Sequence, residues 1–465
     1  MNTIVVGAGG GGIASSLLSS IRGENVTLFE SHSALGGCAS WFKRGPFVFD
    51  AGATTVSGIG VHEPLGELFE LLGHSPSLFP CDPGIVFHLS SGKIIKYHRD
   101  FERWMEELST HFPHLDHRPF WSLVRSLNKK SWGLLKDVKT FPFTNLSDIL
   151  QVLKHPKYLS LVPYLLISTE HLLKKYGLYD REYLEFIDGI LLISAQAESP
   201  FIPSLVGAMA LSYPSETYAP YGGMKGLMDF FEKELLKRHV VIKKRTPVSA
   251  FKKGEVTLRS GEVIRGDKVI LNLPVWNMAK MSEGEVQKKL QQESQKHPGH
   301  WGALTVYFAG KLNVKELYHQ VHLNLPLVKN YFVSFSIPHD EARAPLGYQC
   351  VTISTHVEAG SFINKEELSE IILNDFKKRF PVSDIKFLTT GSPKTFERYT
   401  GRESGFVGGI PFLYGKNPLS LMGAVLKKDS LFRVGDTVFP GQGLCAVVAG
   451  ALQLHHRLKS SDSTF

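Results

Sequence analysis

Cysteine is scarce in this sequence: four occur among 465 residues, far apart and with no Cys-x-x-Cys pair. So few thiols exclude a disulfide scaffold, and the missing pairs exclude a zinc ribbon. Unpaired thiols of this kind are typical of the reducing cytosol. The four are Cys38, Cys81, Cys350 and Cys445.

Long hydrophobic runs are absent as well. No uninterrupted apolar stretch reaches the roughly 18–20 residues that a membrane-spanning helix needs. The chain enters an apolar strand at residues 3–6, without the basic and apolar leader of a signal peptide. We therefore expect a cytoplasmic protein that is either soluble or bound peripherally to the inner face of a membrane.

Neither charge sign dominates the composition. Hydrophobic residues make up 43% and charged residues 21%, a globular balance, and Lys plus Arg exceed Asp plus Glu by 52 to 44 for a net charge of +8. The basic residues alternate with acidic ones and form no recognition motif, so we expect no nucleic-acid partner. The 19 histidines have no metal-ligand spacing, and we expect no metal site.

The first residues form a strand, turn, helix and strand pattern. Residues 3–6 and 26–29 read as strands, and residues 13–21 as a helix rich in small side chains. A strand, helix, strand order of this length predicts a parallel sheet.

The turn in this pattern carries the strongest chemical signal. Residues 7–12, Gly-Ala-Gly-Gly-Gly-Gly, satisfy G-x-G-x-x-G directly between a strand and a helix, and Glu30 ends the next strand. The glycines permit a tight turn, close approach of a pyrophosphate and close helix packing, while the helix N-terminus favours the phosphates. Glu30 is predicted to accept hydrogen bonds from the adenosine ribose. We assign Gly7, Gly9, Gly10, Gly12 and Glu30 to a dinucleotide site.

Two further glycine clusters favour FAD over NAD. An acidic Glu30 disfavours the 2′-phosphate of NADP. Gly36 and Gly37 follow soon after, as do Gly52, Ala53 and Thr54, where backbone could approach a ligand that extends beyond the pyrophosphate.

The C-terminal region supplies a second set of candidate residues. Residues 431–434 read as a strand that ends in Gly435-Asp436, and the glycines of residues 439–443 precede a helix over residues 444–458. Asp436 is predicted to accept from a ribityl hydroxyl, and the glycines to leave backbone free for the flavin ring. The assigned residues are Gly435, Asp436, Gly441, Gln442 and Gly443.

The rest of the chain predicts an α/β protein with interrupted domains. Between the two ends lies a third α/β stretch, with a helix over 227–238, a hairpin over 255–264 and a buried strand over 269–272. We expect a Rossmann-like FAD-binding domain in three segments, with an α+β substrate domain built from two insertions. The first insertion is helical in pattern and the second contains strands. The segments are 1–59, 216–284 and 396–465, and the insertions are 60–215 and 285–395.

These motifs together resemble the FAD-dependent phytoene desaturase and carotenoid isomerase family, within the wider amine-oxidase-like flavoproteins. Residues 5–12, 36–37 with 49–52, 221–224 and 435–443 carry the resemblance, which spans the chain. It implies bound FAD, a domain for a lipid substrate and monotopic membrane attachment. It also implies that Val248 contacts the adenine through its backbone.

The sequence departs from that family at two positions. Cys38 follows the paired glycines, where many carotenoid desaturases carry Arg or Ser, and Ala53 stands where desaturases often have Pro. The family includes desaturases, isomerases, oxidases and saturases, so the resemblance implies the flavin more firmly than the reaction.

The expected chemistry needs few side chains, because the flavin itself exchanges the hydride. We find no catalytic triad or paired-carboxylate signature and identify no catalytic residue. The insertions instead offer apolar runs at residues 186–193 and 201–211, which suit a polyene tunnel without an essential acid or base. Cys445 is interpreted as a buried small hydrophobe and not as a covalent flavin link.

Three functions remain open on the sequence. The leading one is desaturation or cis–trans isomerisation of an apolar polyene by hydride exchange with FAD. The alternatives are a flavin amine oxidase, and a non-catalytic flavoprotein that binds prenyl lipids. Residues 154–167 place basic side chains beside an aromatic and aliphatic stretch, which suits either membrane insertion or a core helix.

Overall fold

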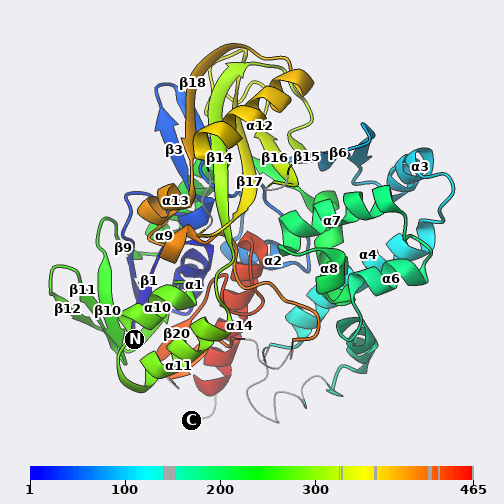
Figure 1. Ribbon diagram of the computed structural model, residues 1–465. Coiled ribbons are helices and arrows are strands. Elements are labelled where there is room, and N and C mark those ends of the chain that lie inside the picture. Colours follow the sequence, from blue (N-terminus) through cyan, green and yellow to red (C-terminus); the bar gives the residue numbers. More distant parts are fainter. Residues whose placement is uncertain are drawn as a thin grey trace.

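The computed structural model describes residues 1–139, 142, 150, 153–323, 325, 328–360, 364–416, 422–427 and 430–462. Two large sheets and a block of helices make up the molecule. The sheet that contains β1 lies at the lower left of Figure 1, the second sheet lies above it, and the helical block lies to the right.

The first sheet has six strands in the order β19-β20-β13-β1-β2-β9. The five strands from β20 to β9 are parallel, and β19 is antiparallel to β20. Strands from all three expected segments pair in this sheet, so the predicted α/β fold class is confirmed. The strands are β1 (Asn2–Val6), β2 (Asn25–Phe29), β9 (Val241–Lys243), β13 (Lys268–Leu271), β19 (Val425–Lys427) and β20 (Leu431–Arg433).

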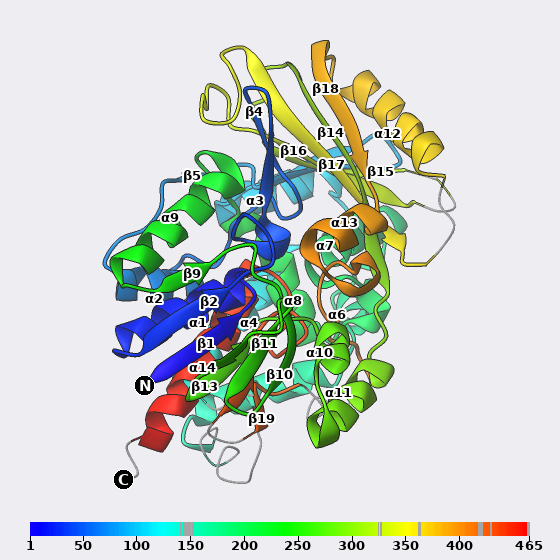
Figure 2. The ribbon, with the colours of Figure 1, turned by 90° about the vertical axis from the view of Figure 1, so that its left-hand side faces the viewer.

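Helices from distant parts of the chain pack beside this sheet, as Figure 2 shows for α1, α9 and α14. Their apolar faces share one core with β1 and β2. Helix α2 also contributes to this core, through Leu65 and Leu68, although it begins the first predicted insertion. The helices are α1 (Gly10–Ile21), α2 (Pro64–Leu72), α9 (Gly223–Lys237) and α14 (Leu444–Asp462).

A small antiparallel sheet follows β9 in the chain. The hairpin predicted over residues 255–264 is confirmed, and a third strand joins it in the order β10-β11-β12. The elements here are β10 (Val248–Lys252), β11 (Glu255–Leu258), β12 (Val263–Arg265), α10 (Val275–Met281) and α11 (Gly284–Lys296).

The second large sheet has seven strands in the order β18-β14-β17-β16-β15-β6-β7, with α12 beside it (Figure 1). Its apolar residues join the largest core of the protein, together with those of the helical block. The elements are β6 (Ile85–His88), β7 (Ile94–Tyr97), β14 (Trp301–Lys311), β15 (Tyr318–His322), β16 (Asn330–Phe335), β17 (Tyr348–Glu358), α12 (Lys365–Arg379) and β18 (Ser383–Gly391).

The first insertion is mostly helical, as its pattern indicates. Asp100 and Asp180 cap α3 and α7 by accepting backbone N–H groups of the first turns. The helices are α3 (Phe101–His111), α4 (Arg118–Asp137), η2 (Pro156–Leu165), α6 (Thr169–Lys175), α7 (Arg181–Ala195), η3 (Ser199–Phe201), α8 (Ser204–Ser212) and η4 (Tyr213–Glu216).

Three strands interrupt that helical block, and the sequence pattern did not predict them. β5 (Leu78–Pro80) pairs with β8 (Tyr218–Pro220), and β6 pairs in parallel with β15 and antiparallel with β7. One partner of β6 is its neighbour β7, but the other, β15, lies in the second insertion, and local periodicity holds no sign of that pairing. The two insertions therefore build one sheet together.

The remaining elements join the two large sheets. They are η1 (Gly37–Ala39), β3 (Trp41–Arg44), β4 (Phe47–Asp50), α13 (Pro393–Thr400) and η5 (Glu403–Gly405). Phe47 and Phe49 of β4 pack with Tyr307 and Ala309 of β14. We propose the domain boundaries expected above, with α2 packed in the core of the first domain. Within the described residues, no helix is both long and apolar enough to cross a membrane.

Candidate functional site

The predicted cofactor residues gather at one edge of the six-stranded sheet. Gly7 follows β1, Glu30 follows β2 and Gly435 follows β20, all of which run parallel. Because the carboxyl ends of parallel strands meet at the same edge, residues from both ends of the chain face one region.

The glycine turn is tight, and no side chain caps the N-terminus of α1 that follows it. Gly7 has φ +92°, and a Cβ on Gly12 would lie 2.0 Å from the Gly7 carbonyl oxygen. Gly9 is the N-cap of α1 and offers no side chain to the first N–H groups, nor does the first turn hold an acidic residue. This end of α1 therefore suits an anionic group that approaches the backbone.

Glu30 lies beside the turn. It is buried, and its Oε2 accepts the Ala8 N–H at 2.7 Å while Oε1 accepts the His32 N–H at 2.8 Å. The Glu30 carbonyl accepts the Thr246 N–H at 2.9 Å, which brings the start of β10, and so Val248, to the same place. The residues expected around the adenosine therefore lie together.

The paired glycines pack against the first turn. The Gly36 N–H donates to the Ala8 carbonyl at 2.8 Å, and a Cβ on Gly37 would lie 3.2 Å from Gly9 Cα. Gly52 and Ala53 come next, since the Ala53 N–H donates to the Cys38 carbonyl at 3.0 Å and a Cβ on Gly52 would lie 2.3 Å from that oxygen.

Thr54 faces the second sheet. Its Oγ1 shares a hydrogen bond of 2.7 Å with Ser334 Oγ on β16, and its carbonyl accepts from Tyr318 Oη at 2.7 Å. Thr54 therefore lies at the junction of the two sheets, and its hydroxyl already has a partner.

The C-terminal glycines form the other side of the site. A Cβ on Gly11 would lie 3.3 Å from the Gly435 nitrogen, while a Cβ on Gly441 or Gly443 would meet no atom within 4 Å. Gln442 Nε2 donates to the Ser194 carbonyl at 2.8 Å, so this side chain points to the end of α7. Cys445 is buried in the first turn of α14, as expected.

Asp436 has a partner that the sequence did not reveal. Its Oδ2 lies 2.8 Å from Nη1 of Arg402, a buried arginine that also interacts with the Cys38 thiol. Burial raises the pKa of Cys38, an effect that Arg402 opposes. Arg402 stands in a stretch with four glycines between residues 401 and 409, but no G-x-G-x-x-G spacing or strand signal links that stretch to the cofactor.

These features fit FAD. The bare N-terminus of α1 suits the diphosphate, the glycine backbones leave room beside it, and Glu30 and Asp436 place carboxylates on either side. Within the described ranges, no three metal-ligating side chains cluster.

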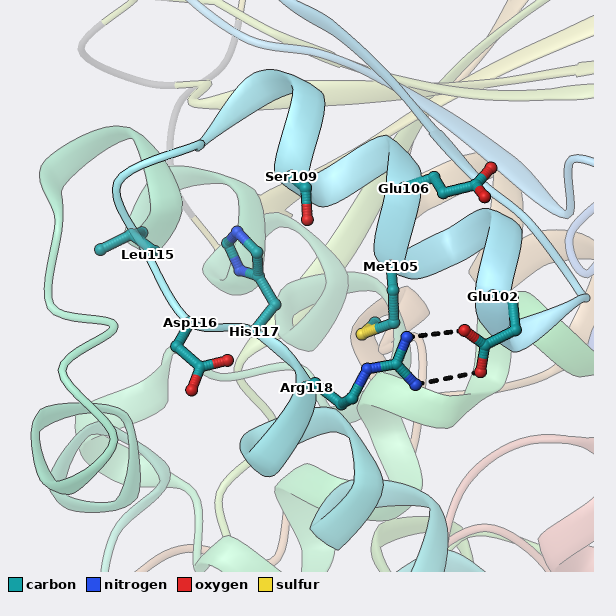
Figure 3. Close-up of a pocket in the computed structure, with 8 residues that line it drawn as sticks. All are labelled: Glu102, Met105, Glu106, Ser109, Leu115, Asp116, His117 and Arg118. Atoms are coloured by element: carbon teal, nitrogen blue, oxygen red, sulfur yellow. Dashed lines mark hydrogen bonds and ion pairs between the residues drawn. The ribbon is translucent and has the colours of Figure 1, made fainter.

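A separate pocket lies away from this site. Figure 3 shows it between α3 and the start of α4, with a volume of ≈ 320 Å³. Arg118 closes one side by donating to both carboxylate oxygens of Glu102 at 3.0 and 2.6 Å. None of the predicted cofactor residues lines it.

The chain belongs to the family described as flavin containing amine oxidoreductase, whose model matches residues 13–397. The cofactor is accordingly FAD, and the protein is an FAD-dependent oxidoreductase. The expected placement within the amine-oxidase-like flavoproteins is thus confirmed.

Several curated relatives match over nearly the whole chain. A chloroplastic prolycopene isomerase from Daucus carota is 26% identical, with 98% of this chain and 80% of the relative covered. A 4,4′-diapolycopen-4-al dehydrogenase from Metabacillus indicus is 23% identical, with 97% and 95% covered. A lycopene-forming phytoene desaturase from Pantoea ananas is 32% identical over 32% of this chain and 30% of its own length.

Solved structures share the fold. An oxidoreductase from Methanosarcina mazei superposes with a TM-score of 0.67 at 17% identity, with 98% of this chain and 100% of that chain covered. A fatty acid isomerase from P. acnes superposes with a TM-score of 0.61 at 14% identity, with 98% of both chains covered.

Proposed function

We propose that this protein acts on an apolar polyene, by desaturation or cis–trans isomerisation through hydride exchange with FAD. The observation that carries the proposal is the nearly full-length similarity to a prolycopene isomerase and a diapolycopenal dehydrogenase, both named for polyenes. The shorter match to a phytoene desaturase supports the same substrate class.

We assign the predicted residues to FAD as follows. Glu30 and the backbone near Val248 hold the adenosine, and the turn from Gly7 to Gly12 holds the diphosphate. Asp436 holds the ribityl chain. The remaining contacts come from backbone at the other glycine-containing loops: Gly36, Gly37, Gly52, Ala53, Thr54, Gly435, Gly441, Gln442 and Gly443. When bound, FAD supplies hydride exchange.

The region around the end of α7, which we propose for the substrate, is apolar. Phe186 and Ile190 of α7 belong to the largest core, as does Leu211 of α8. Gln442 ties α7 to the loop that precedes α14, through its bond to Ser194. A polyene in such surroundings would gain about 25 cal/mol per Å² of buried surface without polar contacts. The chain then contributes orientation and exclusion of water, on which hydride transfer depends.

We also propose a peripheral membrane contact at η2. Leu159, Val162 and Leu166 are 44%, 47% and 65% exposed, while Tyr158 and Leu161 on the same turns are buried. One face of this segment thus belongs to the core and the other presents apolar side chains to the outside. Lys154 is exposed next to that face and suits anionic headgroups, whereas Lys157 pairs with Asp137 at 2.9 Å.

The decisive experiment mixes the FAD-loaded protein anaerobically with phytoene or a cis-polyene. We expect either bleaching of the oxidised flavin with a desaturated product, or isomerised polyene when the flavin is reduced beforehand. The family name makes a polar amine the second candidate substrate class. Flavin reduction by an amine and by no polyene would replace the proposal with an amine oxidase. Polyene retained on purification without turnover would favour the non-catalytic lipid-binding alternative.

A further inference from the structure

The residues proposed for the FAD site share an electrostatic imbalance. Glu30 and Asp436 are acidic and none of the others is basic. FAD adds a diphosphate with two negative charges to these carboxylates. The dipole of α1 offsets only part of this charge, since a helix N-terminus acts as about half an elementary charge. A cation is therefore missing from the predicted set.

Arg402 is a buried cation in the right region. Only 10% of its side chain is exposed. Nε donates to the Phe406 carbonyl at 2.6 Å and Nη2 donates to the Gly408 carbonyl at 2.8 Å, so the loop that follows Arg402 fixes the plane of the guanidinium. Nη1 then meets Asp436 at 2.8 Å.

The partners of the guanidinium place it beside the glycine turn. Cys38, with which it interacts, directly follows Gly37, and Gly37 packs on Gly9. Asp436 directly follows Gly435, whose nitrogen lies against Gly11. Arg402 thus bridges two loops that flank the turn proposed for the diphosphate.

Anchoring of the loop that follows Arg402 does not explain all the bonds of its guanidinium. The bonds from Nε and Nη2 to backbone carbonyls serve that purpose, but the bond from Nη1 leads out of the loop to Asp436. A guanidinium has five N–H groups, of which the two carbonyls and Asp436 take three. One N–H on Nη1 and one on Nη2 remain, in directions that the bound groups fix, and these suit contact with phosphate oxygens.

We propose that Arg402 is the cation that pairs with the phosphate groups of the flavin cofactor and makes the site selective for phosphorylated flavins. The inference rests on the cofactor site assigned under the proposed function, and it is independent of the substrate. In this arrangement Asp436 orients Arg402 as well as receiving the ribityl chain.

The test uses the full-length chain freed of flavin and titrated with FAD, FMN and riboflavin, with quenching of flavin fluorescence as the readout. R402Q is expected to weaken the binding of FAD and FMN at least about tenfold, which is the effect of losing one hydrogen bond between charged groups. Its affinity for riboflavin should change less than about twofold. The FAD affinity of R402K should fall between those of the wild type and R402Q, because lysine keeps the positive charge but lacks the planar array of N–H donors. Added salt should weaken FAD binding more in the wild type than in R402Q.

K280Q is the matched control, because Lys280 forms an exposed ion pair with Glu403, the neighbour of Arg402. Equal losses for all three flavins in R402Q would overturn the proposal in favour of a purely structural arginine. Unchanged FAD affinity would overturn it as well. If R402Q fails to fold, the proposal predicts that C38R/R402Q restores FAD binding with a guanidinium from the adjacent loop, and absence of that rescue counts against it. A wild type that binds none of the flavins would instead overturn the assigned site.

Discussion

Asp50 and Arg343 form a buried ion pair with 2.8 Å between Oδ2 and Nη1. The same arginine donates from Nε to the Val48 carbonyl at 2.7 Å, and Asp50 Oδ1 accepts the Met224 N–H at 2.7 Å. One charge pair therefore holds together the end of β4, the start of α9 and the loop that contains Arg343. These elements border both large sheets.

Removing one member of this pair is expected to be severe. R343M leaves the Asp50 carboxylate buried without its cation and should lower the free energy of unfolding by about 3–5 kcal/mol. Urea unfolding of the FAD-loaded protein measures this change. D229N breaks the partly exposed pair of Asp229 with Lys225 and should cost less than about 1 kcal/mol. A similar small effect in R343M would show that the buried pair is not needed for stability.

The glycine turn makes a prediction about cofactor retention. In Gly9→Val, the Cβ would lie 2.8 Å from Asn272 Nδ2, and the added methyl groups would occupy space that the diphosphate needs. We expect loss of FAD binding, measured as the flavin absorbance of the purified protein and by FAD titration.

Gly133→Ala provides the control for that substitution. Gly133 lies inside α4, where a Cβ would meet only the Tyr158 side chain, at 3.0 Å or more. Alanine is favoured over glycine in a helix by about 1 kcal/mol, so this variant should fold and retain FAD. A yellow, FAD-saturated Gly9→Val protein would contradict the diphosphate assignment.

The sequence predicted the first sheet well because its signals are local. Each motif is recognisable within a short stretch of sequence: the turn at residues 7–12, Glu30 at a strand end, and Gly435-Asp436. A parallel sheet then brings such strand ends together. Arg402 and the pairing of β6 with β15 were missed for the opposite reason. Their partners, Asp436 and β15, are remote in the chain, and no spacing rule connects them.

A pair of carboxyl groups was missed for the same reason. Glu216 lies beside Glu63, the N-cap residue of α2, and Asn128 Nδ2 donates to Glu216 Oε1 at 3.0 Å. Burial, together with the neighbouring Glu63, raises the pKa of Glu216 from 4.5 to about 8. The sequence shows no paired-carboxylate signature, because these residues lie on different elements.

Glu216 should make stability depend on pH. Between pH 4.5 and about 8 the folded protein holds a proton on Glu216 that the unfolded chain releases, so stability falls as pH rises through that window. The slope is on the order of 1.4 kcal/mol per pH unit at most. The glutamine of E216Q stays neutral, so this variant should lose the slope. Its free energy of unfolding relative to wild type should therefore rise from pH 5 to pH 8, by at most about 1.4 kcal/mol per pH unit.

The pH dependence of stability must be measured as the difference between E216Q and wild type, because buried histidines change stability with pH in the opposite direction. Burial lowers the pKa of His88 to about 4 and of His319 to about 3, so both destabilise the fold as pH falls below 6.5. Both proteins share these groups, and they cancel in the difference. Parallel stability profiles for E216Q and wild type would refute a protonated Glu216.

The exposed face of η2 predicts membrane binding that salt weakens only in part. Flotation with liposomes that contain anionic lipid should carry the protein at low salt, since each nearby Lys contributes about 1 kcal/mol while apolar insertion is insensitive to salt. Replacing Leu159, Val162 and Leu166 together by Ser removes the inserted side chains, each of which contributes about 1.5–3 kcal/mol when fully buried. Partitioning should therefore fall at least about tenfold. L71S/L236S alters leucines of similar exposure on α2 and α9 and should float like the wild type. Wild-type protein that stays wholly in the soluble fraction at low salt would exclude η2 as a membrane contact.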